Sequence, residues 1–532
     1  MRCLCPASIP VTIPAMILAV ACALTGAARG DDDPPYVPPP FLTSPPALPP
    51  GSGDKVLPLD LAGAIEIALR QNLGIVVSRS QVQLARLGVA QQIWSAYEPR
   101  LSLGYGHSSS EQPPATLQAG QPGSIITQHS DSWNASVSQN LPTGGSVSAS
   151  VSGGRVASSS GTAIEPLNHA AQATVQLNQP LLRGFSPDLV IPRASILTAK
   201  INSEKARHDF EASAAALIQQ TEAAYWKVVA ALYAYGVEAK SQKLAEDTAA
   251  LLHRQVDAGI GLASDLPGAE ATLAQRKLDV LTAAAAIDQA WDELRTVLAL
   301  PRDQWPTPIL PTERPRFEPG ELPSAEVALD TAVHHRPELA RAQLDLDLSR
   351  LQIREAENSA LPALNFSASA SSYGQASTLG GAASQLVSRS NSGWSIGLNL
   401  DLAPLGRASK VNAEIQRIQR QNQITSQDQL VQTIWNQVRT ALRDQRAAAL
   451  RVIQASKSRT LTGQSLEIEN RKYRNGTSSN LAIAKAQNDL ASAELAELGA
   501  LLNHAQAATS LLLATGQLLD KRHVKIEVAQ ER

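Results

Sequence analysis

Cysteine is nearly absent from this chain of 532 residues, which holds three: Cys3, Cys5 and Cys22. All three lie within the first 22 positions, so a processed chain keeps one cysteine or none. This distribution excludes a disulfide framework and any cysteine-based metal site or nucleophile in the body. Both methionines, Met1 and Met16, lie in the same leader, which excludes a methionine-based metal site in the body.

Aromatic and charged side chains are also scarce. Seven Trp, eight Tyr and five Phe make up 4% of the chain, and charged residues make up 18%, below the roughly 25% of soluble proteins. The 46 basic and 48 acidic residues give a net charge of −2, which argues against a nucleic-acid-binding protein. The length suggests several units or one repeated unit.

The N-terminus has the pattern of a secretory signal peptide over residues 1–30. Arg2 precedes an apolar run, Val11–Leu24, and small residues follow it. A signal anchor is the alternative, although the run is short for a membrane span. Cys22 is a possible lipid anchor, but bacterial lipoprotein signals usually carry Leu three residues earlier, where this chain has Ala19.

Beyond a proline-rich linker, the chain repeats itself. Ala64–Tyr105 matches Val327–Ala368 at an offset of 263, and Gly259 matches Gly476 at an offset of 217. The first copy therefore holds 263 − 217 = 46 extra residues. The predicted divisions are the linker at 31–56, repeat 1 at 57–310, repeat 2 at 320–519 and a C-terminal tail at 520–532.

Each repeat contains a very long helix. Pro192–Asp257 and Ala408–Arg474 show apolar residues at helical spacing and almost no helix breakers. At 1.5 Å per residue such a helix spans on the order of 100 Å, far more than a globular domain needs. Alanine-rich stretches favour close helix packing. The pattern predicts a rod or a tube.

Between the helices, apolar and polar residues alternate over seven to ten positions. This is typical of membrane β-barrel strands; the alternative is a half-buried soluble sheet. Serine, threonine, asparagine and glutamine dominate the polar face, and long loops (106–131, 154–170, 374–392) on one side contrast with a short turn at Leu141–Gly145, which favours the barrel. The predicted strands lie near 100–107, 132–140, 146–153 and 171–178 in repeat 1, and near 363–371 and 393–401 in repeat 2.

The number of strands must be even in each repeat, because both strand regions begin and end at helices on the same side. Six strands cannot enclose a water-filled pore, since about eight make a barrel filled by side chains. Several chains must therefore share one barrel.

These residues resemble the TolC family of outer-membrane efflux and secretion channels. The resemblance lies in the duplicated strand entries Glu98–Leu101 and Leu361–Leu364, the junction Gln179–Phe185, and two helical turns, Arg254–Leu262 and Arg471–Ser478. It implies an all-α coiled-coil tunnel plus membrane β-barrel strands, with two structural repeats per chain. It also implies a homotrimer that shares one β-barrel in the outer membrane and one α-helical barrel in the periplasm.

One feature departs from the family. Its best-known members give four strands per subunit, whereas six strands here would make a barrel of about eighteen in a trimer. A structure with the 133–153 hairpin outside the barrel wall would contradict this count.

The sequence offers no convincing catalytic constellation, which argues against an enzyme and predicts no cofactor. His334 and His335 are adjacent, so they point apart on a helix and are poorly placed to share a metal. Arg183–Phe185 lacks the Gly-Lys-Ser/Thr of a phosphate loop. Leu498–Leu519 is uncharged and long enough to span a bilayer, but polar residues interrupt it and favour a buried bundle helix.

The functional residues are expected at the two helical turns. The resemblance assigns these tips to the periplasmic end, where a periplasmic adaptor protein docks and connects the channel to an inner-membrane pump. The alternative is that glycine simply ends a helix. The candidate docking residues are Gly259, Gly261, Leu262, Asn475, Gly476 and Thr477.

The resemblance also implies an acidic ring at the tunnel entrance, with Glu467 as the first candidate and Glu469 as the second. Three carboxylates around one axis would favour cations; a solvated surface glutamate is the alternative. The predicted function is a passive export channel, the exit duct of a tripartite efflux pump or a type I secretion system, in contact with outer-membrane lipid. A structural coiled-coil spacer or adhesin of the cell envelope is the rival reading.

Overall fold

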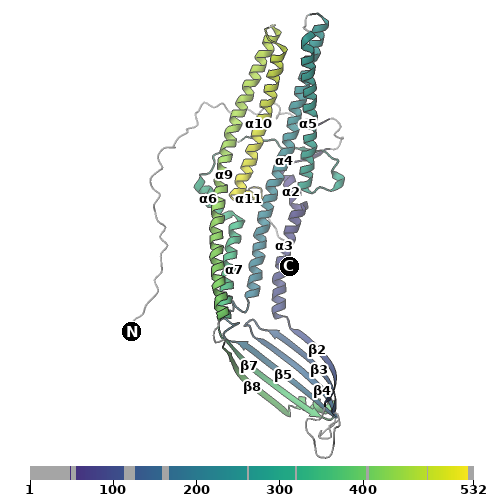
Figure 1. Ribbon diagram of the computed structural model, residues 1–532, viewed down its shortest axis with the longest axis vertical. Helices are drawn as coiled ribbons and strands as arrows, with labels where there is room; N and C mark the ends of the chain where they lie inside the picture. The colour runs from purple at the N-terminus through teal and green to yellow at the C-terminus, as the bar shows by residue number, and fades with distance from the viewer. Residues whose placement is uncertain are drawn as a thin grey trace, which may run out of the picture.

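The computed structural model describes residues 48–49, 56–112, 126–158, 167–259, 263–317, 320–402, 407–475 and 477–524. The signal peptide, Cys22 and nearly all of the proline-rich linker lie outside these ranges. The chain is long and narrow, with a β-sheet at one end and two helical hairpins at the other (Figure 1).

The two halves of the chain have similar element orders, but the first has four strands between its helices and the second has two. The first half contains β1 (Leu57–Leu59), α2 (Leu61–Gln71), α3 (Leu73–Tyr97), β2 (Arg100–Gln112), β3 (Ile126–Asn140), β4 (Ser146–Ser158), β5 (Leu167–Pro180), α4 (Ala194–Asp257), η1 (Ala263–Asp265), α5 (Leu266–Leu298) and η2 (Arg302–Gln304). The second contains β6 (Ile309–Pro311), α6 (Ala325–His335), α7 (Pro337–Ser359), β7 (Ala363–Ala376), α8 (Leu379–Ser388), β8 (Asn391–Asp401), α9 (Arg407–Arg474), α10 (Asn480–Ala514) and α11 (Leu518–Lys521).

Six strands form one sheet in the order β2-β3-β4-β5-β7-β8, with every neighbouring pair antiparallel. The β3–β4 hairpin, which contains residues 133–153, lies within the sheet, so the predicted count of six is confirmed. The strands are longer than predicted, at 11 to 15 residues. The prediction of one long loop at 374–392 is wrong, because this segment contains α8.

The two long helices are α4, with 64 residues, and α9, with 68. By contrast, the helix that precedes each strand region is broken. Asn72 separates α2 from α3, and its side chain accepts hydrogen bonds from the amides of Gly74 and Ile75. Arg336 separates α6 from α7, where Pro337 takes the first helical position. Proline suits that position because it has no amide hydrogen to donate.

The helices form a row rather than a closed bundle. Near the sheet the neighbours are α3, α4, α7 and α9, in that order, which is also the order of the strands they join. Towards the other end the row becomes α5, α4, α10 and α9. Among the described helices, α3 and α5 therefore form one flank of an open row, and α9 forms the other.

A small parallel pairing of β1 with β6 joins the starts of the two halves. The Tyr225 hydroxyl of α4 donates to the Leu59 carbonyl at 3.1 Å, and the Trp291 indole of α5 donates to the Ile309 carbonyl at 2.9 Å. Burial raises the pKa of Tyr225 to about 12. The largest cluster of buried apolar residues surrounds these contacts, so the core lies in the middle of the rod.

Within the described residues, no single helix has the length and apolar composition of a membrane span, although the bent pair α2–α3 passes that test as a unit. The segment 498–519, uncharged in sequence, forms the end of α10 and then α11. Leu498, Leu501 and Leu518 are buried in the main core, which confirms its interpretation as a buried bundle helix.

Candidate functional site: a two-faced sheet and two helical tips

The sheet has one apolar face, which its strand register makes continuous. Paired positions across all six strands carry Leu101, Val137, Ala149, Val175, Ala370 and Trp394. Many of these side chains are exposed, Trp394 to 79%. Water-exposed apolar surface of this extent is unfavourable. A lipid environment would cover it.

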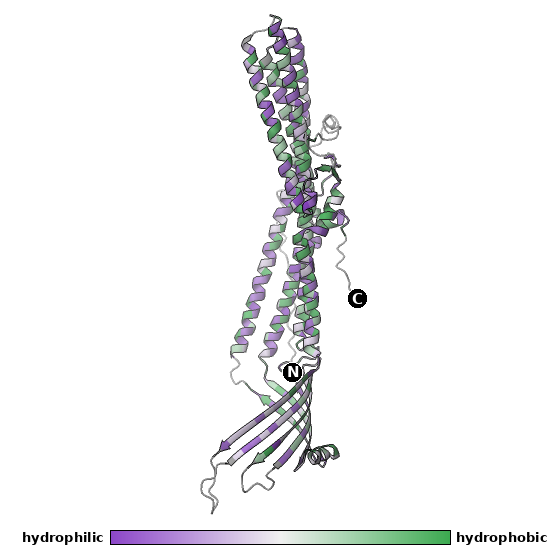
Figure 2. Cartoon of the chain, turned by 90° about the vertical axis from the view of Figure 1, so that its right-hand side faces the viewer, coloured by the Kyte–Doolittle hydropathy of each residue, from purple (hydrophilic) through white to green (hydrophobic). Residues whose placement is uncertain are grey.

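The opposite face is polar along its whole width. The neighbouring row of paired positions carries Ser102, Ser136, Ser150, Thr174, Ser371 and Gly393. Serine hydroxyls hydrogen-bond across strands on this face, for example Ser102 with Ser136 and Ser369 with Ser395, both at 2.8 Å. Figure 2 shows the resulting alternation of hydrophilic and hydrophobic residues along the strands. Neutral polar groups of this kind suit a water-filled lumen.

Two strands of the sheet have one strand neighbour each among the described residues. These are β2, which follows α3, and β8, which precedes α9. Their outer edges present backbone amides and carbonyls that require partners in a membrane. Because the sheet has six antiparallel strands, β2 and β8 run in opposite directions.

The α4–α5 tip turns at Gly259, whose φ of +74° lies in the left-handed region. Its amide donates to the Val256 carbonyl at 3.0 Å, and a Cβ built at this position meets nothing within 4 Å. Glycine is therefore favoured here by backbone conformation and not by space. Gly261 and Leu262 lie outside the described residues.

The α9–α10 tip is held by local hydrogen bonds to the Lys472 carbonyl. The Asn475 amide donates to it at 3.1 Å, and the amide and hydroxyl of Thr477 donate to it at 2.9 and 3.0 Å. Ser479 caps α10 by accepting from the Ala482 amide at 3.3 Å. Gly476 lies outside the described residues. Asn475 and Thr477 thus shape the turn itself.

The two candidate entrance carboxylates have different surroundings. Glu467 is exposed and pairs with Arg471, one helical turn on, at 2.5 Å. Glu469 is more enclosed: it accepts a hydrogen bond from the Ser478 hydroxyl and pairs with Lys472 at 3.1 Å. The hydrogen bond from Ser478, followed by that from Lys472, lowers the pKa of Glu469. The Glu469 carboxylate therefore takes part in the hydrogen bonds of the tip, whereas the Glu467 carboxylate is exposed on the surface of α9.

Polar contacts connect the two hairpins. Near the tips, the Tyr473 hydroxyl donates to Gln255 at 3.4 Å. Further along, Arg276 of α5 donates to Asn488 of α10 at 2.6 Å, and Lys240 pairs with Glu494 at 3.4 Å. These contacts align the hairpins side by side.

Sequence reasoning missed the buried carboxylates, of which Glu222 and Glu497 are the most enclosed. Glu222 of α4 accepts hydrogen bonds from the Thr509 hydroxyl and from Arg522 Nε, the latter at 2.7 Å. Glu497 of α10 is fully buried and pairs with Arg459 Nε at 2.5 Å. Burial raises the pKa of Glu497. A glutamate on an otherwise apolar helical stripe was the available signal.

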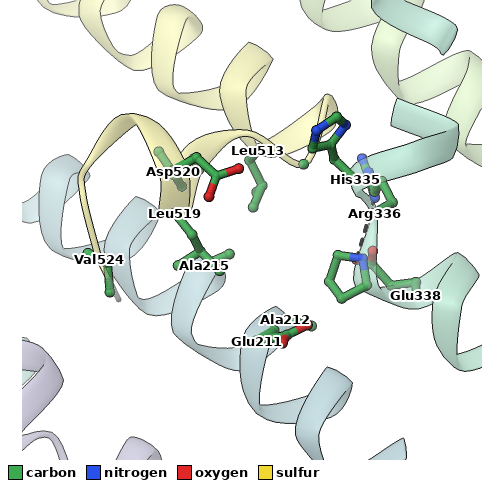
Figure 3. A pocket seen from close by; sticks show the side chains of 13 residues that line it. Glu211, Ala212, Ala215, His335, Arg336, Glu338, Leu513, Leu519, Asp520 and Val524 are labelled. Carbon is green, nitrogen blue, oxygen red and sulfur yellow. Dashed lines mark hydrogen bonds and ion pairs between the residues drawn. The ribbon is translucent and has the colours of Figure 1, made fainter. Parts of the chain in front are cut away.

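A cavity of about 480 Å³ lies beside the α6–α7 break. Figure 3 shows Arg336 and Glu338 on one side of it and Leu519 and Asp520 on the other. Arg336 donates to the Ala514 carbonyl at 2.9 Å and to Gln437 at 2.8 Å, so it joins the break to α10 and α9. Burial lowers its pKa. These contacts are structural and supply no reactive group.

The adjacent histidines bond back to their own helix. His334 Nδ1 lies 2.8 Å from the Asp330 carbonyl oxygen, and His335 Nδ1 lies 2.9 Å from that of Thr331. Among the described residues, no group of three or more His, Cys, Asp or Glu side chains is arranged to hold a metal ion.

Comparison with known proteins agrees with this geometry. Residues 328–517 match the family model of the outer membrane efflux protein. A membrane protein from Pseudomonas aeruginosa is similar in structure, with a TM-score of 0.65 and 17% identity over 94% of this chain and 100% of that one. No curated protein matches in sequence.

Two outer membrane channels have the same fold. CmeC of Campylobacter jejuni has a TM-score of 0.63 and 15% identity, over 86% of each chain. MtrE of Neisseria gonorrhoeae, in its open state, has a TM-score of 0.60 and 20% identity over 86% of this chain and 89% of that one.

Residues 328–517 therefore match the outer membrane efflux protein family, and the fold over most of the chain is that of outer membrane channels. The rival reading, an envelope spacer or adhesin, accounts for neither the family match nor a sheet with an apolar and a polar face.

Proposed function

We propose that this protein is the passive exit duct of a tripartite efflux pump or a type I secretion system, and that it works as a homotrimer. The observation that carries the proposal is the six-stranded sheet, which has one lipid-compatible face, one water-compatible face and two free edges. A single copy cannot satisfy those edges in a membrane.

Three copies would close the barrel. Since β2 and β8 run in opposite directions, β8 of one copy is suited to pair antiparallel with β2 of the next. The result is 3 × 6 = 18 strands, and barrels of about 16–18 strands leave an aqueous channel. Four strands per copy, as in the best-known relatives, would make a narrower barrel.

The flanking helices support the same arrangement. On α3, Leu84, Leu87 and Trp94 are exposed; on α9, Ile418 and Trp435 are exposed. These flanks continue the two free edges of the sheet, because α3 leads into β2 and β8 leads into α9. Packing α9 of one copy against α3 of the next would bury both apolar flanks and close a tunnel.

The tips would serve as the docking site for a periplasmic adaptor, through which an inner-membrane pump drives export. Support comes from their location, at the end of the rod farthest from the sheet (Figure 1). It also comes from Gly259, Asn475 and Thr477, which give both tips defined turns. Glu467 would line the entrance, with Glu469 behind it.

The experiment that tests this proposal is the protein mass of detergent-extracted material, from light scattering corrected for bound detergent. We expect three chains per particle, followed by stepwise conductance in planar bilayers. A monomer, or a protein that stays in solution without detergent, would overturn the shared barrel.

A further inference from the structure

Helix α8 is a short helix in the loop between β7 and β8, on the side of the sheet away from the rod (Figure 1). Thr378 caps it by accepting from the Gly381 amide at 3.2 Å, and Arg389 ends it with a φ of +53°. Its neighbours are β7 and β5. Figure 2 shows it as a hydrophobic helix beside the sheet.

The helix lies on the apolar face. Ser372 and Gly374 share that face with Ala370, because alternate residues of a strand point to the same side. The Ser372 hydroxyl donates to the Leu386 carbonyl at 2.9 Å, and a Cβ at Gly374 would lie 1.9 Å from the Ala382 carbonyl oxygen. Glycine at 374 thus admits the backbone of α8 directly onto the face that we assign to lipid.

The position of α8 along the strands coincides with a change of chemistry. On β5, Ala171 pairs with Gly374 and is buried, and the next outward residue of the same face is His169. His169 Nδ1 lies 3.1 Å from the Ser377 carbonyl oxygen, just before α8.

The neighbouring strands make the same transition from apolar to ionisable residues. On β3, Trp133 is followed outward on this face by Asp131, and on β4, Gly153 is followed by Arg155. His107 of β2 pairs with Asp131, at 2.8 Å. Aromatic residues next to charged ones are typical of a membrane–water boundary. Helix α8 therefore lies where the apolar band ends.

One stripe of α8 remains uncovered. Ala382 is fully buried against the sheet, and Gln385 accepts a hydrogen bond from the Gln375 amide at 3.0 Å. Leu379, Ala383 and Val387 recur every four residues and are exposed, Val387 to 80%. We call these three residues the α8 ridge. The side of the helix opposite this ridge carries Gly381, Gln385 and Ser388.

We propose that α8 is an in-plane helix at the lipid–water boundary of the outer leaflet, with the α8 ridge in contact with lipid. This inference rests on the proposed membrane barrel. Amphipathic helices of this kind bury an apolar face about 5–10 Å into the boundary region. A second copy of the chain is a less suitable occupant, because α8 packs on β5 and β7 and not at the free edge of β2 or β8.

The scarcity of cysteine makes a direct test possible, since Ser can replace Cys22 and leave a body without thiols. Single nitroxide labels would be placed at A383C on the ridge, at S388C about 140° around the helix, and at I396C on the apolar face of β8. Collision with oxygen and with a water-soluble nickel chelate would be measured for the trimer in phosphatidylcholine vesicles.

We expect an oxygen-to-nickel collision ratio several-fold higher at A383C than at S388C, and a high ratio at I396C. A low ratio at A383C beside a high one at I396C would overturn the lipid contact and leave the barrel intact. Shielding of A383C from both reagents would also overturn it, in favour of a protein partner. A low ratio at I396C would instead overturn the barrel.

Discussion

The long helices α4 and α9 occupy equivalent places in the two halves and have similar lengths. Many more side chains are buried on α4 than on α9. Of the described residues, 21 are buried in α4 and eight in α9. At the offset of 217, Ile218 corresponds to Trp435 and Tyr233 to Leu450. The first member of each pair is buried, whereas Trp435 is 49% exposed and Leu450 is 63% exposed.

The two helices therefore differ in packing although they occupy equivalent places in the two halves. Helix α4 lies inside the row, with α3, α5, α7 and α10 around it, and the core at β1–β6 is built on its side chains. Helix α9 lies at the flank of the described helices, so apolar residues such as Trp435 and Leu450 are exposed on its outer side. A long helix in the equivalent place therefore supplies a core in the first half and, in our proposal, a subunit interface in the second.

The largest expected effect concerns an ion pair that repeat 2 has and repeat 1 lacks. Arg459 and Glu497 correspond to Gln242 and Val280. Arg459→Ala leaves the Glu497 carboxylate buried without its cation, which costs on the order of 3–5 kcal/mol of stability. The measurement is the thermal unfolding midpoint by circular dichroism.

The pH dependence of this variant has a defined sign. Because burial raises the pKa of Glu497 above its ordinary value of 4.5, the folded state holds the proton more tightly than the unfolded state. Stability is then full below about pH 4.5 and is lost as the pH rises through the raised pKa. The deficit of Arg459→Ala should shrink on acidification. A deficit independent of pH would show that packing, not charge, is responsible.

A control converts the repeat 2 pair into its repeat 1 equivalent. The double variant Arg459→Gln/Glu497→Val removes both charges, and replacement of a buried ion pair by uncharged groups is often near neutral. We expect it to unfold at a higher temperature than Arg459→Ala.

The next effect separates core from interface. Ile218→Ala removes a fully buried side chain and should cost about 2–5 kcal/mol, seen as a lower unfolding midpoint. Trp435→Ala should leave the helical content unchanged and instead reduce the fraction of trimer on native gels. The control is Gln432→Ala, because Gln432 is an exposed polar residue three positions before Trp435 on α9. Equal trimer yields for Trp435→Ala and Gln432→Ala would remove α9 from the interface.

The regular parts of the fold were predictable from sequence because each repeats a short period over many residues. The 64 residues of α4 make about eighteen helical turns. Each turn, like each alternation along β8, repeats the same apolar pattern. The β1–β6 pairing was missed, since Leu57–Leu59 and Ile309–Pro311 are three residues each and contain proline. Its stability comes from Tyr225 and Trp291, whose contacts are long-range.

Other features depend on tertiary contact in the same way. Helix α8 lies in a segment rich in glycine and serine, and it is stabilised by the sheet through Ser372 and Gly374. The α6–α7 break had a local signal in Pro337, which follows Arg336. The duplicated glycines predicted where the two tips lie. The hydrogen bond from Ser478 to Glu469 could not be predicted, because it forms only in the folded turn.

A smaller effect on stability is expected at the first tip. Gly259→Val forces a branched residue into a left-handed conformation, at a local cost of about 1–2 kcal/mol. Trimer yield should be unchanged while transport is lost, as measured by export of a substrate in cells. A bulky residue at Gly476 should act alike.

Gly268→Val provides the matched control for this tip, because Gly268 lies in the first turns of α5, has open space around it and has no positive φ. If Gly268→Val abolished transport equally, bulk near the tip and not the turn at Gly259 would be responsible. Normal transport by Gly259→Val would count against docking at the tips.

The smallest expected effect distinguishes the two entrance carboxylates. Arg471 neutralises Glu467 on the surface of α9, so Arg471→Ala should raise the cation preference of single channels and Glu467→Ala should lower it. One charge near a water-filled constriction is worth about 1 kcal/mol or less, so the permeability ratio should change by a factor of about two to five. Glu469→Ala should instead loosen the turn that Ser478 stabilises and increase conductance fluctuations. An unchanged ratio in both Arg471→Ala and Glu467→Ala would place this pair outside the entrance.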